Sequence, residues 1–164
     1  MKKILALTMV LTLLALLPTT LAEETATIAP LEGLITEIND DGFLMNDATF
    51  GDVQVNFGDD TRFEGSVSDK DGYEVGQYVF VDYNGQMTRS LPPQVSADVV
   101  RCFIASGAVS EILESGVMLE DETLGQVIVH VGEGAPNLYL GMHVTVYYNG
   151  VMAMSLPGQI GALH

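Results

Sequence analysis

The sequence predicts an all-β protein built from two tandem small β-barrels, OB-like or SH3-like, after an N-terminal signal peptide. Three observations support this prediction. The chain matches itself at fixed offsets. Apolar and polar residues alternate over short stretches that end at glycine and turn residues. The first 22 residues have the basic start, apolar run and small-residue end of a secretory signal.

The first segment, residues 1–22, carries the prediction of export. Lys2 and Lys3 precede an apolar run that Pro18 interrupts, and Ala22 marks the expected cleavage site. The run is shorter than the roughly 20 residues that a membrane-spanning helix requires. We therefore expect a secreted or cell-envelope protein with no membrane span in its mature form, preceded by a short lead over residues 23–30.

The internal repeat defines two copies of one module. Residues 33–38 match residues 107–112 at an offset of 74, and Tyr-Asn-Gly at 83–85 matches the same tripeptide at 148–150 at an offset of 65. Copy 1 spans residues 31–99 and copy 2 spans residues 104–163. The change in offset means that copy 2 lacks nine residues, and we place the deficit between Gly58 and Gly76 of copy 1.

Each copy reads as a series of short strands. In copy 1 we expect them at residues 34–38, 43–45, 53–57, 79–83 and 87–90. Asn84-Gly85 favours a two-residue hairpin between the last two, because a type I′ turn needs positive φ at both positions. Pro92-Pro93 would end the return strand. A closed barrel removes exposed sheet edges, and a flat meander is the alternative.

The segments 81–97 and 146–162 share the pattern Tyr-Asn-Gly-x-Met-x-x-Ser-Leu-Pro-x-Gln. This closing motif resembles that of an uncharacterised small β-barrel module of exported Firmicutes proteins. The resemblance covers nearly all of the chain after the signal segment, although copy 2 has Ala153-Met154 in place of Thr88-Arg89. It implies a barrel fold and export, and it implies no activity.

The charge of the chain excludes one class of partner. The sequence has 22 acidic and six basic residues, for a net charge of −16, and removal of residues 1–22 would leave 22 acidic and four basic residues, or −18. Nucleic-acid binding requires a positive surface, so we expect no nucleic-acid partner. An unidentified protein or a basic ligand is the partner that this charge favours.

No catalytic pattern is recognisable, so we expect a protein that is not an enzyme. There is no Gly-x-Ser-x-Gly motif and no phosphate-binding loop. The main hypothesis is an exported, non-enzymatic binding or interaction module of the cell envelope or secretome. An unrecognised hydrolase is one alternative, and it would need His130 or His143 beside two carboxylates. The single cysteine, Cys102, lies in an apolar stretch that favours burial over an intermolecular disulfide.

Four polar residues occur at matched positions without an evident structural reason. They are Ser90 and Gln94 in copy 1 and Ser155 and Gln159 in copy 2. One interpretation is a ligand groove that is repeated in both barrels. The other is a side chain that bonds the backbone of the proline corner beside it.

The loop that copy 2 lacks is the strongest candidate for a metal site. Asp69, Asp71 and Glu74 supply hard oxygen ligands around Gly72, as calcium prefers, so a calcium-binding surface module is a second alternative. A solvated acidic loop would have the same composition. Otherwise no cofactor is expected. A weaker candidate is copper(I), for which the thioether and imidazole ligands would come from Met142, His143, Met152 and Met154.

Overall fold

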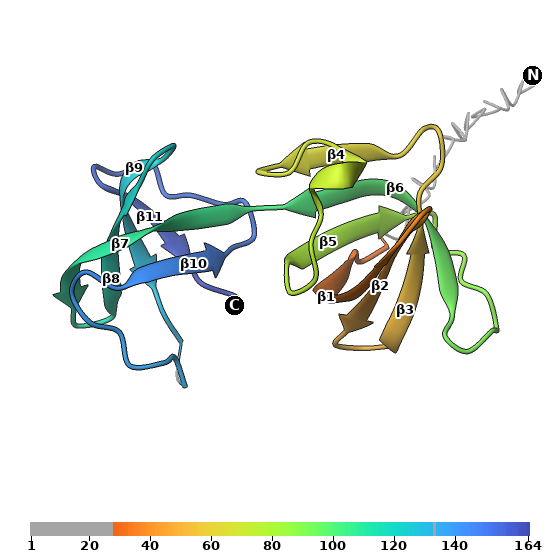
Figure 1. Cartoon of the computed structure of the whole chain (residues 1–164), viewed down its shortest axis with the longest axis horizontal. Helices are drawn as coiled ribbons and strands as arrows, with labels where there is room; N and C mark the ends of the chain where they lie inside the picture. The colour runs from red at the N-terminus through yellow and green to blue at the C-terminus, as the bar shows by residue number, and fades with distance from the viewer. Residues whose placement is uncertain (1–27, 133) are drawn as a thin grey trace, which may run out of the picture.

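A computed structural model describes residues 28–132 and 134–164. The chain is all-β and forms two small barrels side by side, joined by a single strand-to-strand connection (Figure 1). The predicted signal peptide and its cleavage site lie outside the described residues. Within the described ranges, no helix is long and apolar enough to cross a membrane.

Copy 1 consists of six strands and one short 3-10 helix. In chain order they are β1 (Leu31–Asn39), β2 (Gly42–Asp47), β3 (Gly51–Asn56), β4 (Arg62–Gly65), η1 (Lys70–Gly72), β5 (Tyr78–Tyr83) and β6 (Gln94–Cys102). Copy 2 has five strands, which are β7 (Ile104–Leu113), β8 (Gly116–Asp121), β9 (Gly125–His130), β10 (His143–Tyr147) and β11 (Gly158–Gly161).

The strand order of copy 1 closes a five-stranded barrel. The neighbours run β3-β2-β1-β5-β6, and β6 returns to β3 through a parallel contact that aligns Gln54 with Gln94. Strand β4 lies on the far edge of β6. A parallel contact between the third and last barrel strands belongs to a Greek-key barrel, which is the OB-like form. An antiparallel meander has no such contact.

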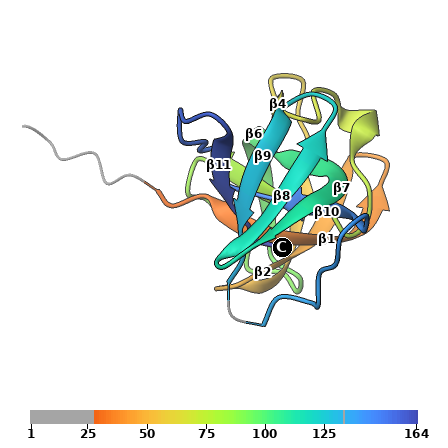
Figure 2. The same ribbon diagram turned by 90° about the vertical axis from the view of Figure 1, so that its left-hand side faces the viewer.

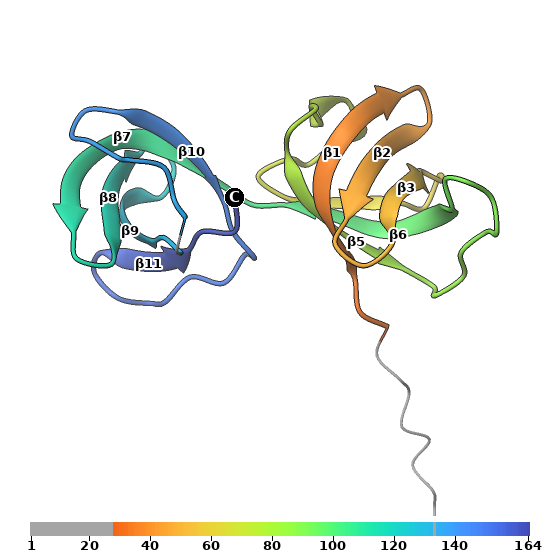
Figure 3. The ribbon, with the colours of Figure 1, turned by 90° about the horizontal axis from the view of Figure 1, so that it is seen from below.

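Copy 2 repeats this order as a half-barrel, β10-β7-β8-β9-β11, with the same parallel contact between β9 and β11. Its seam is bridged by two backbone hydrogen bonds. Tyr147 N donates to the His164 carbonyl at 2.9 Å, and Leu163 N donates to the Tyr147 carbonyl at 2.8 Å. Figure 3 shows how the strands of each copy curve around their own interior, and Figure 2 shows the molecule with copy 2 toward the viewer.

Each copy has its own hydrophobic core, as the alternation of apolar residues predicts. Phe43, Met45, Val53 and Val55 are fully buried in copy 1, and valine or leucine residues at the equivalent positions fill copy 2. Cys102 is fully buried in the core of copy 1, which confirms its expected burial. Burial raises the pKa of its thiol to about 12, so the thiol stays protonated.

One serine ties the two copies together where β6 passes into β7. Ser66 N donates to the Cys102 carbonyl at 2.7 Å, and Ser66 Oγ accepts a hydrogen bond from Ile104 N at 2.9 Å. Ile104 and Tyr147 also pack against the core of copy 1. The connection is therefore a bonded junction with side-chain packing on both sides.

The prediction of a hairpin at Asn84-Gly85 is wrong. Residues 84–93 form an irregular loop, which we call closing loop 1, and the strand that pairs with β5 is β6, beginning at Gln94. The side chain of Asn84 accepts a hydrogen bond from Gln86 N at 2.9 Å, so this Asn-Gly pair makes a local side-chain turn. Closing loop 2, residues 149–158, repeats this turn with Asn149 and Val151 at 3.0 Å.

Candidate functional site

The acidic loop of copy 1 does not gather its carboxylates. Asp69 caps η1 by accepting a hydrogen bond from Asp71 N at 3.0 Å, and Glu74 N bonds the Gln77 side chain at 3.2 Å. Among the residues that the structure describes, no three acidic, histidine or cysteine side chains are grouped to hold a metal ion. Calcium binding at Asp69, Asp71 and Glu74 stays a prediction with no such grouping to support it.

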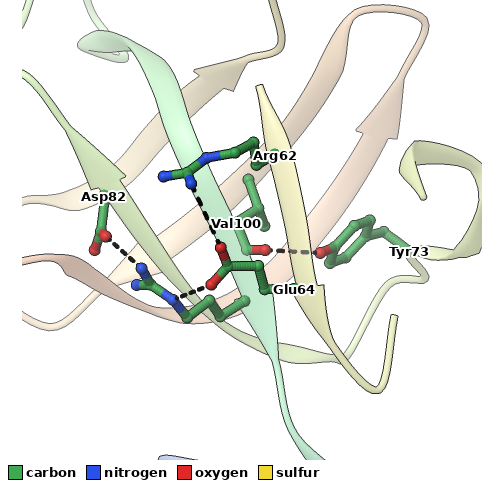
Figure 4. Close-up of polar contacts among 6 residues, drawn as sticks. Arg62, Glu64, Tyr73, Asp82 and Val100 are labelled. Atoms are coloured by element: carbon green, nitrogen blue, oxygen red, sulfur yellow. Dashed lines mark hydrogen bonds and ion pairs between the residues drawn. The ribbon is translucent and has the colours of Figure 1, made fainter. Parts of the chain in front are cut away.

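Two apolar residues of the same insertion, Phe63 and Tyr73, join Phe57, which follows β3, to cover one end of barrel 1. Phe57, Phe63 and Tyr73 form an aromatic lid over Phe43, with ring centroids 5.0 Å apart for Phe57 and Phe63 and 5.7 Å apart for Phe63 and Tyr73. Tyr73 is buried, and its hydroxyl donates to the Val100 carbonyl at 3.3 Å (Figure 4). Burial raises the pKa of this hydroxyl, which keeps it a donor.

The two matched serines bond the proline corners beside them. Ser90 Oγ donates to the Pro92 carbonyl at 2.8 Å, and Ser155 Oγ donates to the Pro157 carbonyl at 2.7 Å. This is the structural role that we set against a ligand groove. The same bond in both copies holds the closing loops in the same local shape.

The two matched glutamines lie at the parallel contact that closes each barrel. Gln94 accepts a hydrogen bond from the side chain of Asn56 at 3.4 Å, and Gln159 Oε1 lies 2.9 Å from Nε2 of His130, the equivalent of Asn56. Each pair joins the third barrel strand to the last one. Gln159 Nε2 also donates to Ser155 Oγ at 3.2 Å, so these two matched residues do lie together in copy 2.

The two candidate histidines lie on different strands of copy 2, and one of them, His143, lines a cleft that Glu120 and Glu122 also line, as the hydrolase alternative requires. His130 and His143 are both exposed, on β9 and β10. The partners of the His130 ring are Ser115 and Gln159, at 3.3 Å and 2.9 Å. The copper ligand set is also divided, because Met142 and Met152 pack against the core of copy 2 while Met154 is fully exposed.

The structure shows a matched pair of aspartates that was not predicted from the sequence. Asp47 is 4% exposed, and it accepts hydrogen bonds from Glu32 N, Thr49 N and Phe50 N at 2.8 to 3.0 Å. Asp121, 74 residues later, does the same for Ser106 N, Thr123 N and Leu124 N at 2.7 Å. The repeat itself was the signal that could have found them, since each is the last residue of the second strand of its copy.

One ion cluster holds the outer face of copy 1. Arg101 Nε lies 3.0 Å from Glu64, and Arg101 Nη2 lies 2.7 Å from Asp82, so one guanidinium ties β6 to both β4 and β5 (Figure 4). Its hydrogen bonds, that to Asp82 first, raise the pKa of Arg101 above its ordinary value. The cluster adds a side-chain contact to the backbone pairing of the four-residue edge strand β4 with β6.

Each closing loop presents a fully exposed leucine at the same position. Leu91 is 96% exposed and Leu156 is 102% exposed, and both stand between the matched serine and the matched proline. Neither loop contains an acidic residue, although the chain has 22. In copy 2, an apolar groove of about 710 Å³ runs beside Leu156 and is lined by Leu124, Met152 and Met154.

Comparison with known proteins adds no relative to this description, since neither a family model nor a curated protein matches the chain.

Proposed function

We propose that the protein is an exported, non-enzymatic binding module of the cell envelope or secretome, and that it docks on a partner protein through its closing loops. The observation that most supports this proposal is the pair of fully exposed leucines, Leu91 and Leu156. The matched serines and aspartates, which both copies also keep, have structural roles. The serines bond proline carbonyls and the aspartates bond turn amides.

An exposed leucine contributes nothing of this kind to its own fold. Burying one leucine side chain against a partner is worth about 1.5–3 kcal/mol, so each loop tip can supply a substantial share of a binding energy. The loops carry no carboxylate to desolvate, which lowers the cost of covering them. A protein partner with apolar pockets fits these tips, and its positive charge would attract the acidic remainder of the chain.

The test is affinity capture from culture fluid and envelope extracts, with the captured proteins identified by mass spectrometry. We expect the wild type to retain one defined protein and Leu91→Ser/Leu156→Ser to lose it. Val75→Ser is the matched control, because Val75 is also exposed, at 62%, and lies outside both loops. Equal capture by wild type and the double variant, or no specific capture, would refute the proposal.

A further inference from the structure

A second surface of the molecule is the cleft between the two barrels. It has a volume of about 890 Å³ and is lined by Ser66 from copy 1 and by Glu120, Glu122, Thr123, His143 and Tyr148 from copy 2. The Ser66 junction described above holds its floor, through the bond from Ile104 N to Ser66 Oγ. The cleft lies mainly on copy 2, and residues 65 and 66 of copy 1 complete its lining.

Tyr148 belongs to the core of copy 2 and also lines this cleft. The residue is 7% exposed, and its hydroxyl has no hydrogen bond to any described residue. Because no fully buried side-chain nitrogen or oxygen in the described ranges lacks a partner, the Tyr148 oxygen is not fully buried. Burial, with the charge of Asp121 nearby, raises the pKa of Tyr148 and keeps the hydroxyl neutral.

The negative charge of the cleft is particular to copy 2. The positions equivalent to Glu120 and Glu122 are Asn46 and Ala48 in copy 1. At the first of these positions, the cross-strand pair carries the same total charge in both copies. Copy 1 pairs Asn46 with Asp52 at 2.9 Å, and copy 2 pairs Glu120 with Gln126 at 2.9 Å, so the carboxylate has moved from the third strand to the second.

In copy 2 the carboxylate of this pair therefore belongs to Glu120, which lines the cleft. Asp121, between the two glutamates, is already saturated by three backbone amides. The cleft therefore combines two exposed carboxylates with one nearly buried, unpaired hydroxyl. Hydrogen-bond acceptors of this kind fit a cation that carries N–H donors.

We propose that the cleft between the barrels binds an organic cation bearing ammonium or guanidinium groups, with Glu120 and Glu122 pairing the charge and the Tyr148 oxygen accepting an N–H. This proposal deepens the proposed binding role and rests on it only in requiring no catalysis. None of the three residues that would bind the cation belongs to a closing loop. Lysine or arginine side chains of a peptide and free polyamines share the required chemistry.

The experiment titrates the purified protein with trilysine, triarginine, spermidine or Ca²⁺ and follows backbone amide shifts by NMR. Binding in the cleft should shift Ser66, Thr123 and Tyr148 together. Tyr148→Phe removes only the hydroxyl and should weaken the cation about tenfold, as expected for a hydrogen bond to a charged group. Tyr83→Phe makes the same change at the equivalent position of copy 1 and should leave the affinity unchanged.

A charge-neutral swap gives the sharpest control. Glu120→Asn/Gln126→Asp restores the copy 1 arrangement, keeps an amide–carboxylate pair and keeps the net charge. It should also weaken binding about tenfold, and addition of Glu122→Ala should weaken it further. If the swap variant binds as tightly as the wild type, the affinity comes from the overall charge and the proposal fails.

The remaining outcomes identify the source of the cation or overturn the proposal. Stronger binding of a tripeptide than of spermidine assigns the cleft to peptide side chains, and the reverse assigns it to polyamines. Absence of saturable binding by all three organic cations, or Ca²⁺ binding alone, overturns the proposal. Failure here would leave partner capture through Leu91 and Leu156 intact, so the two proposals can fail separately.

Discussion

In the two copies, segments of different length and structure cover the same end of the barrel. In copy 1 the segment between β3 and β5 supplies Phe63 of the edge strand β4, together with Val67 and Tyr73, and these residues pack in or against the core. In copy 2 the equivalent loop has no regular element among its described residues, and Tyr139 and Leu140 are each 64% exposed. A longer loop has added core and ordered structure to barrel 1.

The comparison also shows how composition can mislead. The insertion is acidic, which is why it predicts a calcium site, yet Asp69 accepts a local backbone hydrogen bond while Asp71 and Glu74 are exposed. The residues between them, Val67 and Tyr73, are the ones that are buried. An acidic loop can therefore act mainly through its few apolar side chains, because burial of an aromatic ring outweighs an exposed charge.

The largest test removes the centre of the aromatic lid. Tyr73→Ala should lower the free energy of unfolding of copy 1 by about 3–5 kcal/mol, as for other buried aromatic residues, while copy 2 keeps its stability. Urea unfolding followed by hydrogen exchange at individual amides in the two cores would measure this. An equal loss of protection in both copies would mean that the barrels unfold as one unit and would break the comparison.

The next test uses the matched aspartates. Asp47→Ala and Asp121→Ala each leave three backbone amides without their acceptor and should cost about 2–3 kcal/mol. Asp47 is the more deeply buried of the two, so its replacement should cost more. Unfolding midpoints of the two single variants decide the order. A loss below about 0.5 kcal/mol in both would show that solvent replaces the carboxylate at no cost.

A smaller effect is expected for the ion cluster of copy 1. Arg101→Gln separates Glu64 and Asp82 from their shared cation and should cost about 1 kcal/mol, since all three side chains are partly exposed. The loss should shrink in 1 M salt, which screens exposed pairs. Thermal unfolding at low and high salt would measure it, with Arg89→Gln on closing loop 1 as the control. An effect independent of salt would point to lost packing of the arginine stem.

The smallest expected effect is a dependence on acid. Burial raises the pKa of Asp121, but bonds from Leu124, Ser106 and Thr123 outweigh it and lower the pKa. The stability that comes from this lowered pKa is present above the unfolded value of about 3.9 and is lost as pH falls through the folded pKa. Urea unfolding of copy 2 between pH 6 and pH 2 should therefore show a decline that Asp121→Asn reduces. An unchanged slope would assign the decline to other carboxylates.

Much of the candidate site depended on knowing which residues are exposed. The sequence singled out Ser90, Gln94, Ser155 and Gln159 because both copies keep them, and all four lie in or beside the closing loops. Leu91 and Leu156 belong to the same motif, but the sequence gives no sign that both are exposed. Their exposure follows from the loop path, which no local pattern encodes.

The amino-acid sequence by itself determined the duplication, the all-β class and the buried faces of most strands, because a period of two is a local property of the chain. Tertiary structure decided which strands pair. Strand β6 begins directly after Pro92-Pro93, where the sequence predicts a strand end, and it pairs with three strands, β3, β4 and β5. Asn84-Gly85 suits either a hairpin or a side-chain turn locally, and closure of the barrel selects the second. The pairing of β6 with other strands is favoured over a hairpin at Asn84-Gly85, because strand pairing satisfies a whole row of backbone amides and a hairpin turn would satisfy only a few.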